Sequence, residues 1–162
     1  AGTDVVKNRT NGFTERLEEL GSKIKVVDSQ NADWDRNTAK DVAATILKTY
    51  PDLKIICCNN DVMAMGALEA VKESGKTLNQ DVYVIGMDGT DEAYESIRAN
   101  ELSATVSMYP LYESQMATEC AVRILLGQEM PSVIWTPAMV TDATNVDADE
   151  ADTIGWTDPT FE

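Results

Sequence analysis

Two short apolar runs in this chain end in the same way, and this repetition restricts the fold more than any other feature. Residues 55–58 lead into Asn59 and Asn60, and residues 82–87 lead into Asp88. A short apolar run bounded by polar and turn residues is typical of a strand buried on both faces of a parallel sheet. Open α/β sheets bind ligands at the carboxyl ends of such strands, so Asn60 and Asp88 are the first candidate ligand contacts.

Apolar periodicity predicts helices and strands in alternation along most of the chain. Helices are expected at about residues 4–20, from Asp33 or Asp35 to Pro51, and at about residues 61–75, 90–99 and 111–126. Strands are expected at about residues 23–27, 53–58, 82–87, 102–108 and 138–141. Repeated strand-then-helix units predict an α/β fold, a doubly wound and mostly parallel sheet with helices on both faces.

The residue that begins the third predicted helix is Asp61. An Asp that follows a strand and precedes an apolar helical stripe is typical of a helix N-cap, because its carboxylate accepts hydrogen bonds from the first backbone N–H groups. We therefore expect Asp61 to cap this helix, and we favour that structural role over ligand binding.

The chain opens directly into a helix, although a strand should precede the first helix of a doubly wound sheet. The predicted strand at residues 23–27 then lacks its natural neighbour, and exposed sheet edges are a liability. We expect that the first strand is missing from this chain and that these residues form the second part of a longer protein.

Charge and composition exclude several classes of partner. With 28 acidic and 13 basic residues, the net charge of −15 disfavours nucleic acid, which binds clusters of Lys and Arg. No apolar run reaches the roughly 18–20 residues that span a bilayer, and the first residues lack the order of a signal peptide. We expect any export signal to lie outside this sequence.

Motifs of catalysis, metal binding and cofactor binding are not found. The sequence contains neither GxSxG, GxGxxG nor GxxxxGK, and it has no histidine to act as a base or ligand. Three cysteines without CxxC spacing are best interpreted as small buried side chains. The acidic run at residues 147–152 lacks the glycine and spacing of a calcium loop. We therefore expect no enzyme activity, no metal and no cofactor.

Five short motifs occur in a fixed order along the chain. They are Arg9–Phe13, Ala32–Arg36, Asn59–Ala67, Val84–Gly89 and Leu102–Val106. Together they resemble the carboxyl-terminal half of a type I periplasmic sugar-binding protein, the group that contains the ribose-, allose- and glucose/galactose-binding proteins of bacterial ABC transporters. Each motif alone is a weak signal, whereas five in this order are highly specific.

The resemblance implies a division of the chain. In that family two α/β lobes, joined by three crossing segments, close on a sugar. Residues 1–106 would be the carboxyl-terminal sugar-binding lobe, residues 107–146 would hold hinge crossings with a helix and strand of the other lobe, and residues 147–162 would be an acidic tail. The missing amino-terminal lobe would come from the same protein or from a companion chain.

The family's contact positions map onto five residues of this sequence: Arg9, Trp34, Asn60, Asp88 and Met108. The first four have suitable chemistry, since a carboxylate, an amide and a guanidinium bind hydroxyls and an indole stacks on a sugar ring. Met108 is a departure, because related proteins commonly carry an amide there. It implies a ligand that lacks a hydroxyl, or carries an apolar group, at that point. Lys54 stands where some relatives place a calcium-binding carboxylate, so no calcium site is expected.

The function implied by the resemblance is that of a solute-binding component of a sugar ABC transporter. It would bind a monosaccharide between two lobes and deliver it to a membrane permease, without covalent chemistry. Its location would be periplasmic or extracellular, either free or lipid-anchored to the cytoplasmic membrane. The alternative is the sensor core of a sugar-responsive transcription regulator, which would require a helix-turn-helix segment upstream.

Overall fold

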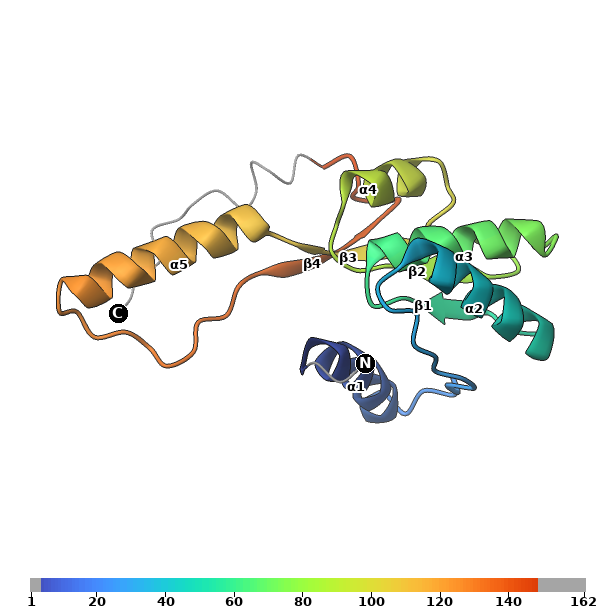
Figure 1. The fold of residues 1–162 in the computed structure, drawn as a ribbon, viewed down its shortest axis with the longest axis horizontal. Coiled ribbons are helices and arrows are strands. Elements are labelled where there is room, and N and C mark those ends of the chain that lie inside the picture. The colour runs from blue at the N-terminus through green and yellow to red at the C-terminus, as the bar shows by residue number, and fades with distance from the viewer. Residues whose placement is uncertain (1–3, 149–162) are drawn as a thin grey trace.

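A four-stranded mixed sheet organises residues 4–148, the part of the chain that the computed structural model describes. The strands are β1 (Ile55–Cys57), β2 (Tyr83–Ile85), β3 (Ala104–Met108) and β4 (Ala138–Asp142), in the order β1-β2-β3-β4 (Figure 1). The first three run parallel, and β4 pairs antiparallel with β3. The sheet confirms the predicted α/β class, and each strand overlaps a predicted one.

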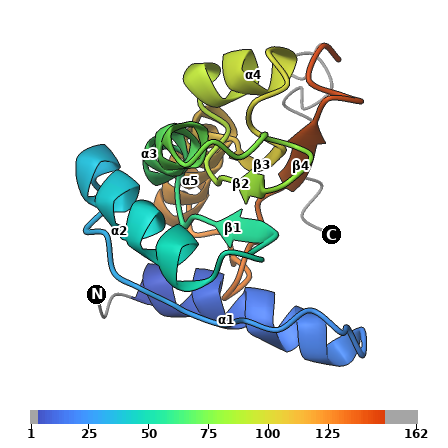
Figure 2. The same cartoon turned by 90° about the vertical axis from the view of Figure 1, so that its right-hand side faces the viewer.

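Five helices accompany the sheet within the same residues. They are α1 (Asp4–Glu19), α2 (Arg36–Thr49), α3 (Asp61–Glu73), α4 (Asp91–Arg98) and α5 (Pro110–Leu125). Figure 2 shows α2, α3 and α4 on one side of the sheet and α1 on the opposite side. Each helix begins and ends close to its predicted bounds, and the arrangement is that of a doubly wound sheet.

The core lies between α3 and its neighbours. Helix α3 is buried on nearly every side because its small residues let other elements approach it closely. At Gly66 a Cβ atom would lie against the carbonyl oxygen of Arg36 and 3.1 Å from the backbone nitrogen of Lys40. Only glycine therefore permits this contact between α3 and α2.

The predicted strand at residues 23–27 is wrong. These residues form no regular element in the structure, and Ile24 and Val26 are each 50% exposed. An isolated strand is not stable without a neighbour to accept and donate its backbone hydrogen bonds. The edge strand β1 does not supply that neighbour, so the apolar residues of this segment face outward.

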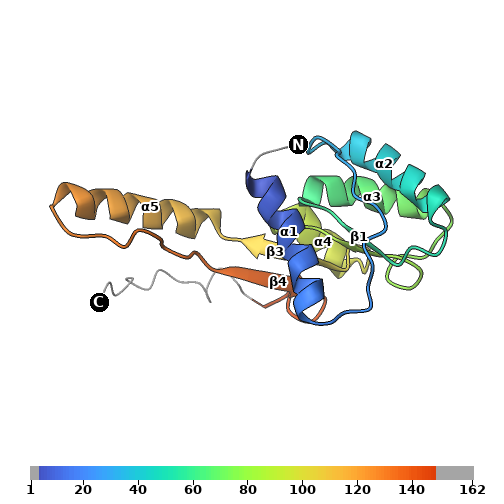
Figure 3. The same ribbon diagram turned by 90° about the horizontal axis from the view of Figure 1, so that it is seen from below.

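Helix α5 stands away from the other helices. Strands β3 and β4 run together out of the sheet, and α5 lies beyond them (Figures 1 and 3). Met116 is the only buried residue of α5, whereas Ile124 and Leu125 are 60% and 86% exposed. The boundary predicted at residues 106 and 107 falls inside β3, and that division stays a prediction. Of the predicted acidic tail, residues 149–162 lie outside the described residues.

No helix within residues 4–148 combines the length and the apolar character that crossing a bilayer requires.

Candidate functional site

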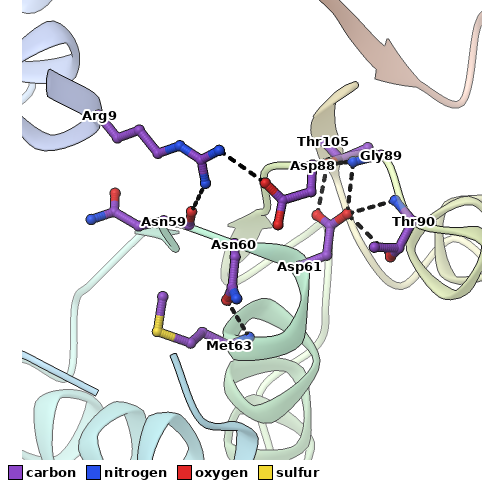
Figure 4. A network of polar contacts seen from close by, with 9 residues as sticks. All are labelled: Arg9, Asn59, Asn60, Asp61, Met63, Asp88, Gly89, Thr90 and Thr105. Atoms are coloured by element: carbon purple, nitrogen blue, oxygen red, sulfur yellow. Dashed lines mark hydrogen bonds and ion pairs between the residues drawn. The ribbon is translucent and has the colours of Figure 1, made fainter. Parts of the chain in front are cut away.

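The candidate site lies where the chain leaves β1 and β2. The two strands are parallel neighbours, so their carboxyl ends meet at one edge of the sheet. Residues 59–61 follow β1 and residues 88–90 follow β2, as Figure 4 shows. The structure therefore brings together the two polar segments that the sequence pattern singled out.

Arg9 reaches this edge from α1. One guanidinium nitrogen lies 3.0 Å from a carboxylate oxygen of Asp88, and another donates to the backbone carbonyl of Asn59 at 2.5 Å (Figure 4). Asn59 in turn donates from its side-chain amide to the hydroxyl of Thr10 at 3.2 Å. These contacts attach α1 to the end of β1 and place a cation beside a carboxylate.

Trp34 borders the same cation. The guanidinium carbon of Arg9 lies 6.0 Å from the centroid of the Trp34 ring, at the outer limit of a cation–π contact. Trp34 is 38% exposed and has a positive φ of 62°, following Asp33 at 49°. Asp35 is the N-cap of α2, so of the two predicted caps the structure selects the second. The indole ring of Trp34 is partly exposed and can therefore stack on a ligand.

Asn60 caps helix α3, which corrects the role predicted for Asp61. The side-chain oxygen of Asn60 accepts a hydrogen bond from the backbone nitrogen of Met63 at 2.9 Å. Helix α3 begins one residue later than its cap, so Asp61 occupies the first turn instead. Because the cap uses the amide oxygen of Asn60, a ligand would meet mainly its donating NH₂ group.

Asp61 is buried, with 1% of its surface exposed, and it binds the segment that follows β2. One carboxylate oxygen accepts from the backbone nitrogens of Gly89 and Thr90, both at 2.9 Å. The other accepts from the hydroxyl of Thr105 at 2.7 Å. Sequence reasoning missed this role. The sequence feature that corresponds to it is the glycine at position 86, because a Cβ atom there would lie against the Asp61 carboxylate.

Asp88 is held in an unusual conformation. Its φ is 123°, a region that residues other than glycine rarely adopt, at a cost of about 1–3 kcal/mol. Its backbone nitrogen donates to Val106 at 2.9 Å, and its carbonyl accepts from Met108 at 3.0 Å. Burial raises the pKa of the Asp88 carboxyl, and the nearby Arg9 opposes that rise. A strained, half-buried carboxylate of this kind favours a functional role.

Met108 ends β3 beside Asp88. The structure brings its backbone into contact with Asp88 through the hydrogen bond between the two main chains, and its side chain is partly buried. Arg9, Trp34 and Asp88 are thus joined by direct side-chain contacts. Asn60 follows Asn59, which Arg9 binds, and Met108 adjoins Asp88 through a main-chain hydrogen bond.

The chemistry available at this edge is hydrogen bonding and stacking. A guanidinium donates, a carboxylate accepts and an amide does both, so together they match the donors and acceptors of a polyhydroxylated ligand. The thiol of Cys58 stands next to this segment, but burial raises its pKa to about 12. It therefore carries little of the thiolate form that nucleophilic attack needs at neutral pH.

Comparison with known proteins gives a consistent set of relatives. Residues 1–129 match the family model described as periplasmic binding protein domain. The ribose import binding protein of Bacillus subtilis (strain 168) is 38% identical over 84% of this chain and 42% of its own length. The D-allose-binding periplasmic protein of Escherichia coli (strain K12) is 46% identical over 68% of this chain and 34% of its own.

Solved structures agree in fold. A periplasmic solute-binding protein of an ABC transporter from Actinobacillus succinogenes 130z, with bound D-allose, superposes with a TM-score of 0.82 at 32% identity. The Caulobacter myo-inositol binding protein, bound to myo-inositol, gives 0.77 at 34% identity. Each comparison covers 90% of this chain and 50% of the solved chain. The chain thus spans half or less of the length of these relatives.

Proposed function

This chain belongs to the periplasmic binding protein domain family, and from that membership we propose that it forms one lobe of a two-lobe solute-binding protein of a sugar ABC transporter. The whole protein would bind a monosaccharide or a similar ring polyol and deliver it to a membrane permease. It would act on the outer side of the cytoplasmic membrane, either free or attached by a lipid.

The observation that carries this proposal is the cluster of Arg9, Trp34 and Asp88. Each hydroxyl of a sugar both donates and accepts, and the ion pair between Arg9 and Asp88 presents a donor and an acceptor 3.0 Å apart. The half-exposed ring of Trp34 offers an apolar surface for the C–H face of the ring. Asn60 adds an amide donor. These residues, with Met108, are the proposed ligand contacts.

Exposed apolar surface supports the proposal of a second lobe. Helix α5 has several large apolar side chains in solvent, and so has the segment before α2. They are Leu111, Val122, Ile124, Leu125 and Leu126 in or next to α5, and Ile24, Val26 and Val27 in the earlier segment. Large apolar side chains gathered in solvent on one segment are typical of an interface. We propose that residues 107–146 complete the missing lobe, and that the exposed edge of β1 pairs with the missing first strand.

Closure between two lobes would be a shift in population. A ligand that contacts both lobes binds the closed state more tightly than the open state, so it raises the closed fraction without any covalent step. In the structure the Asp88 carboxylate pairs with Arg9. A sugar hydroxyl would join this pair, since a carboxylate has further acceptor positions.

Isothermal titration calorimetry of the full-length protein tests the proposal. The panel is D-ribose, D-allose, myo-inositol and D-fucose, compounds named with proteins similar to this chain. We expect saturable heat with at least one of them and none with D-sorbitol, an open-chain control. Absence of heat with all four compounds would contradict the proposed function.

Met108 is expected to determine ligand preference. If its thioether faces an apolar part of the ligand, Met108→Gln should favour a ligand with one more hydroxyl. The expected change in the affinity ratio is about tenfold, the value of one added hydrogen bond. Calorimetry with matched pairs measures it, using D-galactose against D-fucose and D-ribose against 2-deoxy-D-ribose. Met108→Leu is the control and should keep the wild-type ratio. An unchanged ratio in Met108→Gln for every pair that binds argues against this role.

A further inference from the structure

The segment that carries Asp88 is held from both sides. Before the turn, the backbone of Asp88 exchanges hydrogen bonds with Val106 and Met108 of β3. After the turn, the backbone nitrogens of Gly89 and Thr90 donate to one oxygen of Asp61 at 2.9 Å each. A residue with a φ of 123° persists only when its surroundings determine its conformation. Strand β3 supplies one half of that support and Asp61 the other.

The Asp61 carboxylate connects three elements. It belongs to the first turn of α3, it accepts from the segment after β2, and its second oxygen accepts from Thr105 in β3 at 2.7 Å. The hydroxyl of Thr90 adds a contact at 3.2 Å (Figure 4). Asp61 is only 1% exposed, so the loss of a partner would leave a buried carboxylate oxygen without its hydrogen bond.

The turn is packed closely against its neighbours at both of its glycines. At Gly89, whose φ is 76°, a Cβ atom would lie 2.7 Å from the Cα of Ser107 and 2.7 Å from the Tyr94 hydroxyl. At Gly86 it would lie against Asp61 itself. The turn therefore packs directly on β3 and α4, and the Asp61 carboxylate binds its N–H groups.

We propose that Asp61 is a positioning residue for ligand binding: through Gly89, Thr90 and Thr105 it sets the direction in which Asp88 presents its carboxylate to Arg9 and to the sugar. Asp61 itself does not touch the ligand. This inference rests on the proposed function, since it assigns a purpose to Asp88 as a sugar contact. It differs from a helix cap, because the cap of α3 is Asn60.

The test is a double-mutant cycle in the full-length protein, with calorimetry against the compound of the four-member panel that the wild type binds most tightly. Asp61→Asn keeps the size of the side chain but removes acceptor capacity, so the turn loses part of its support. We expect affinity to fall about tenfold to a hundredfold. In the Asp88→Asn background the same change should cost less than about threefold, because the two residues act through one contact. Equal losses in both backgrounds would indicate general damage to the lobe and overturn the proposal.

A second pair of variants decides the question if Asp61→Asn does not fold. Thr105→Val is isosteric and removes the hydroxyl bound to Asp61, whereas Thr105→Ser retains it. We expect Thr105→Val to bind the sugar about threefold to tenfold more weakly than the wild type, and Thr105→Ser to bind it with wild-type affinity. If both Thr105 variants bind like the wild type, the positioning role is wrong even though the protein binds sugar. A wild-type protein that binds no compound of the panel contradicts the proposed function, and this proposal with it.

Discussion

Replacing Asp88 with asparagine is expected to weaken sugar binding by a factor of about 100 or more. A carboxylate can accept from two hydroxyls, and each hydrogen bond to a charged group contributes roughly 1.5–3 kcal/mol. Asparagine keeps one acceptor and presents a donor in place of the other. Two weakened bonds correspond to about two orders of magnitude or more in the dissociation constant. Calorimetry of the full-length protein with the same panel of compounds measures this loss.

The matched control for Asp88→Asn is Asp91→Asn. Asp91 begins α4 three positions further along the chain and is exposed, so its replacement removes a charge near the site without removing a proposed contact. We expect it to bind sugar like the wild type. If both variants lose affinity equally, the effect is one of net charge, and Asp88 is not a direct ligand.

Because the pKa of Asp88 is raised, ligand affinity is expected to depend on pH. Burial is the main cause of the rise, and Arg9 works against it. The proposed contact needs the ionised carboxylate, so affinity should be lost as pH falls through a pKa that lies above the usual aspartate value. Folding responds in the opposite sense. The folded lobe favours protonated Asp88, so this residue detracts from stability as pH rises through the interval between its unfolded and folded pKa values. At neutral pH, thermal unfolding of Asp88→Asn should therefore occur at the wild-type temperature or slightly above it.

Replacing Gly66 with alanine is expected to destabilise the lobe by roughly 2–4 kcal/mol. The added methyl group would occupy the position of the Arg36 carbonyl oxygen, and it would lie 3.1 Å from the Lys40 nitrogen. Both obstacles are backbone atoms of α2, which cannot rotate away as a side chain can. Helices α2 and α3 would have to separate, with loss of packing at the centre of the core. Urea unfolding of the full-length protein, followed by circular dichroism, measures the change.

Gly12 is the matched control for Gly66, because a side chain at this position meets no other atoms. It lies inside α1, is exposed, and a Cβ atom there would meet nothing within 4 Å. Gly12→Ala should therefore leave stability unchanged or raise it by about 0.5–1 kcal/mol, because alanine loses less backbone entropy than glycine in a helix. If Gly66→Ala is as well tolerated as Gly12→Ala, the close approach of α2 and α3 is not a constraint on the fold.

Apolar periodicity predicted the helices and most strands because each pattern reflects a face that the fold buries. Helices α2 and α3 show this, since their stripes meet in the core. The segment at residues 23–27 shows the limit of the method. Its composition suits a strand, yet a strand depends on a neighbour, and no property of the segment itself reports whether that neighbour exists. Its apolar side chains are exposed instead.

The candidate site shows a similar limit at the scale of single residues. Strand ends identified Asn60 and Asp88, but neighbouring Asn60 and Asp61 are both good helix caps, and local preference cannot decide between them. The choice depends on where α3 begins relative to the turn after β2. Once Asn60 takes the cap, Asp61 points to Gly89, Thr90 and Thr105. Those three partners lie 28 to 44 positions away, so only the tertiary structure reveals the contact.

Strands β3 and β4 have a mechanical consequence for the whole molecule. They pair along their full lengths, from Ala104 with Asp142 to Met108 with Ala138, and α5 lies beyond them. Two strands joined in this way bend and twist as one ribbon, so the part that carries α5 cannot swing on a single loose tether. Ser107 lies within the ribbon, where its hydroxyl bonds to Thr141 at 2.6 Å and to Tyr94 at 2.9 Å. The backbone of Asp88 pairs with that of the same Ser107 in an isolated parallel β-bridge. The backbone that carries the Asp88 carboxylate is thus attached to this ribbon, so any bending of the ribbon would displace the carboxylate.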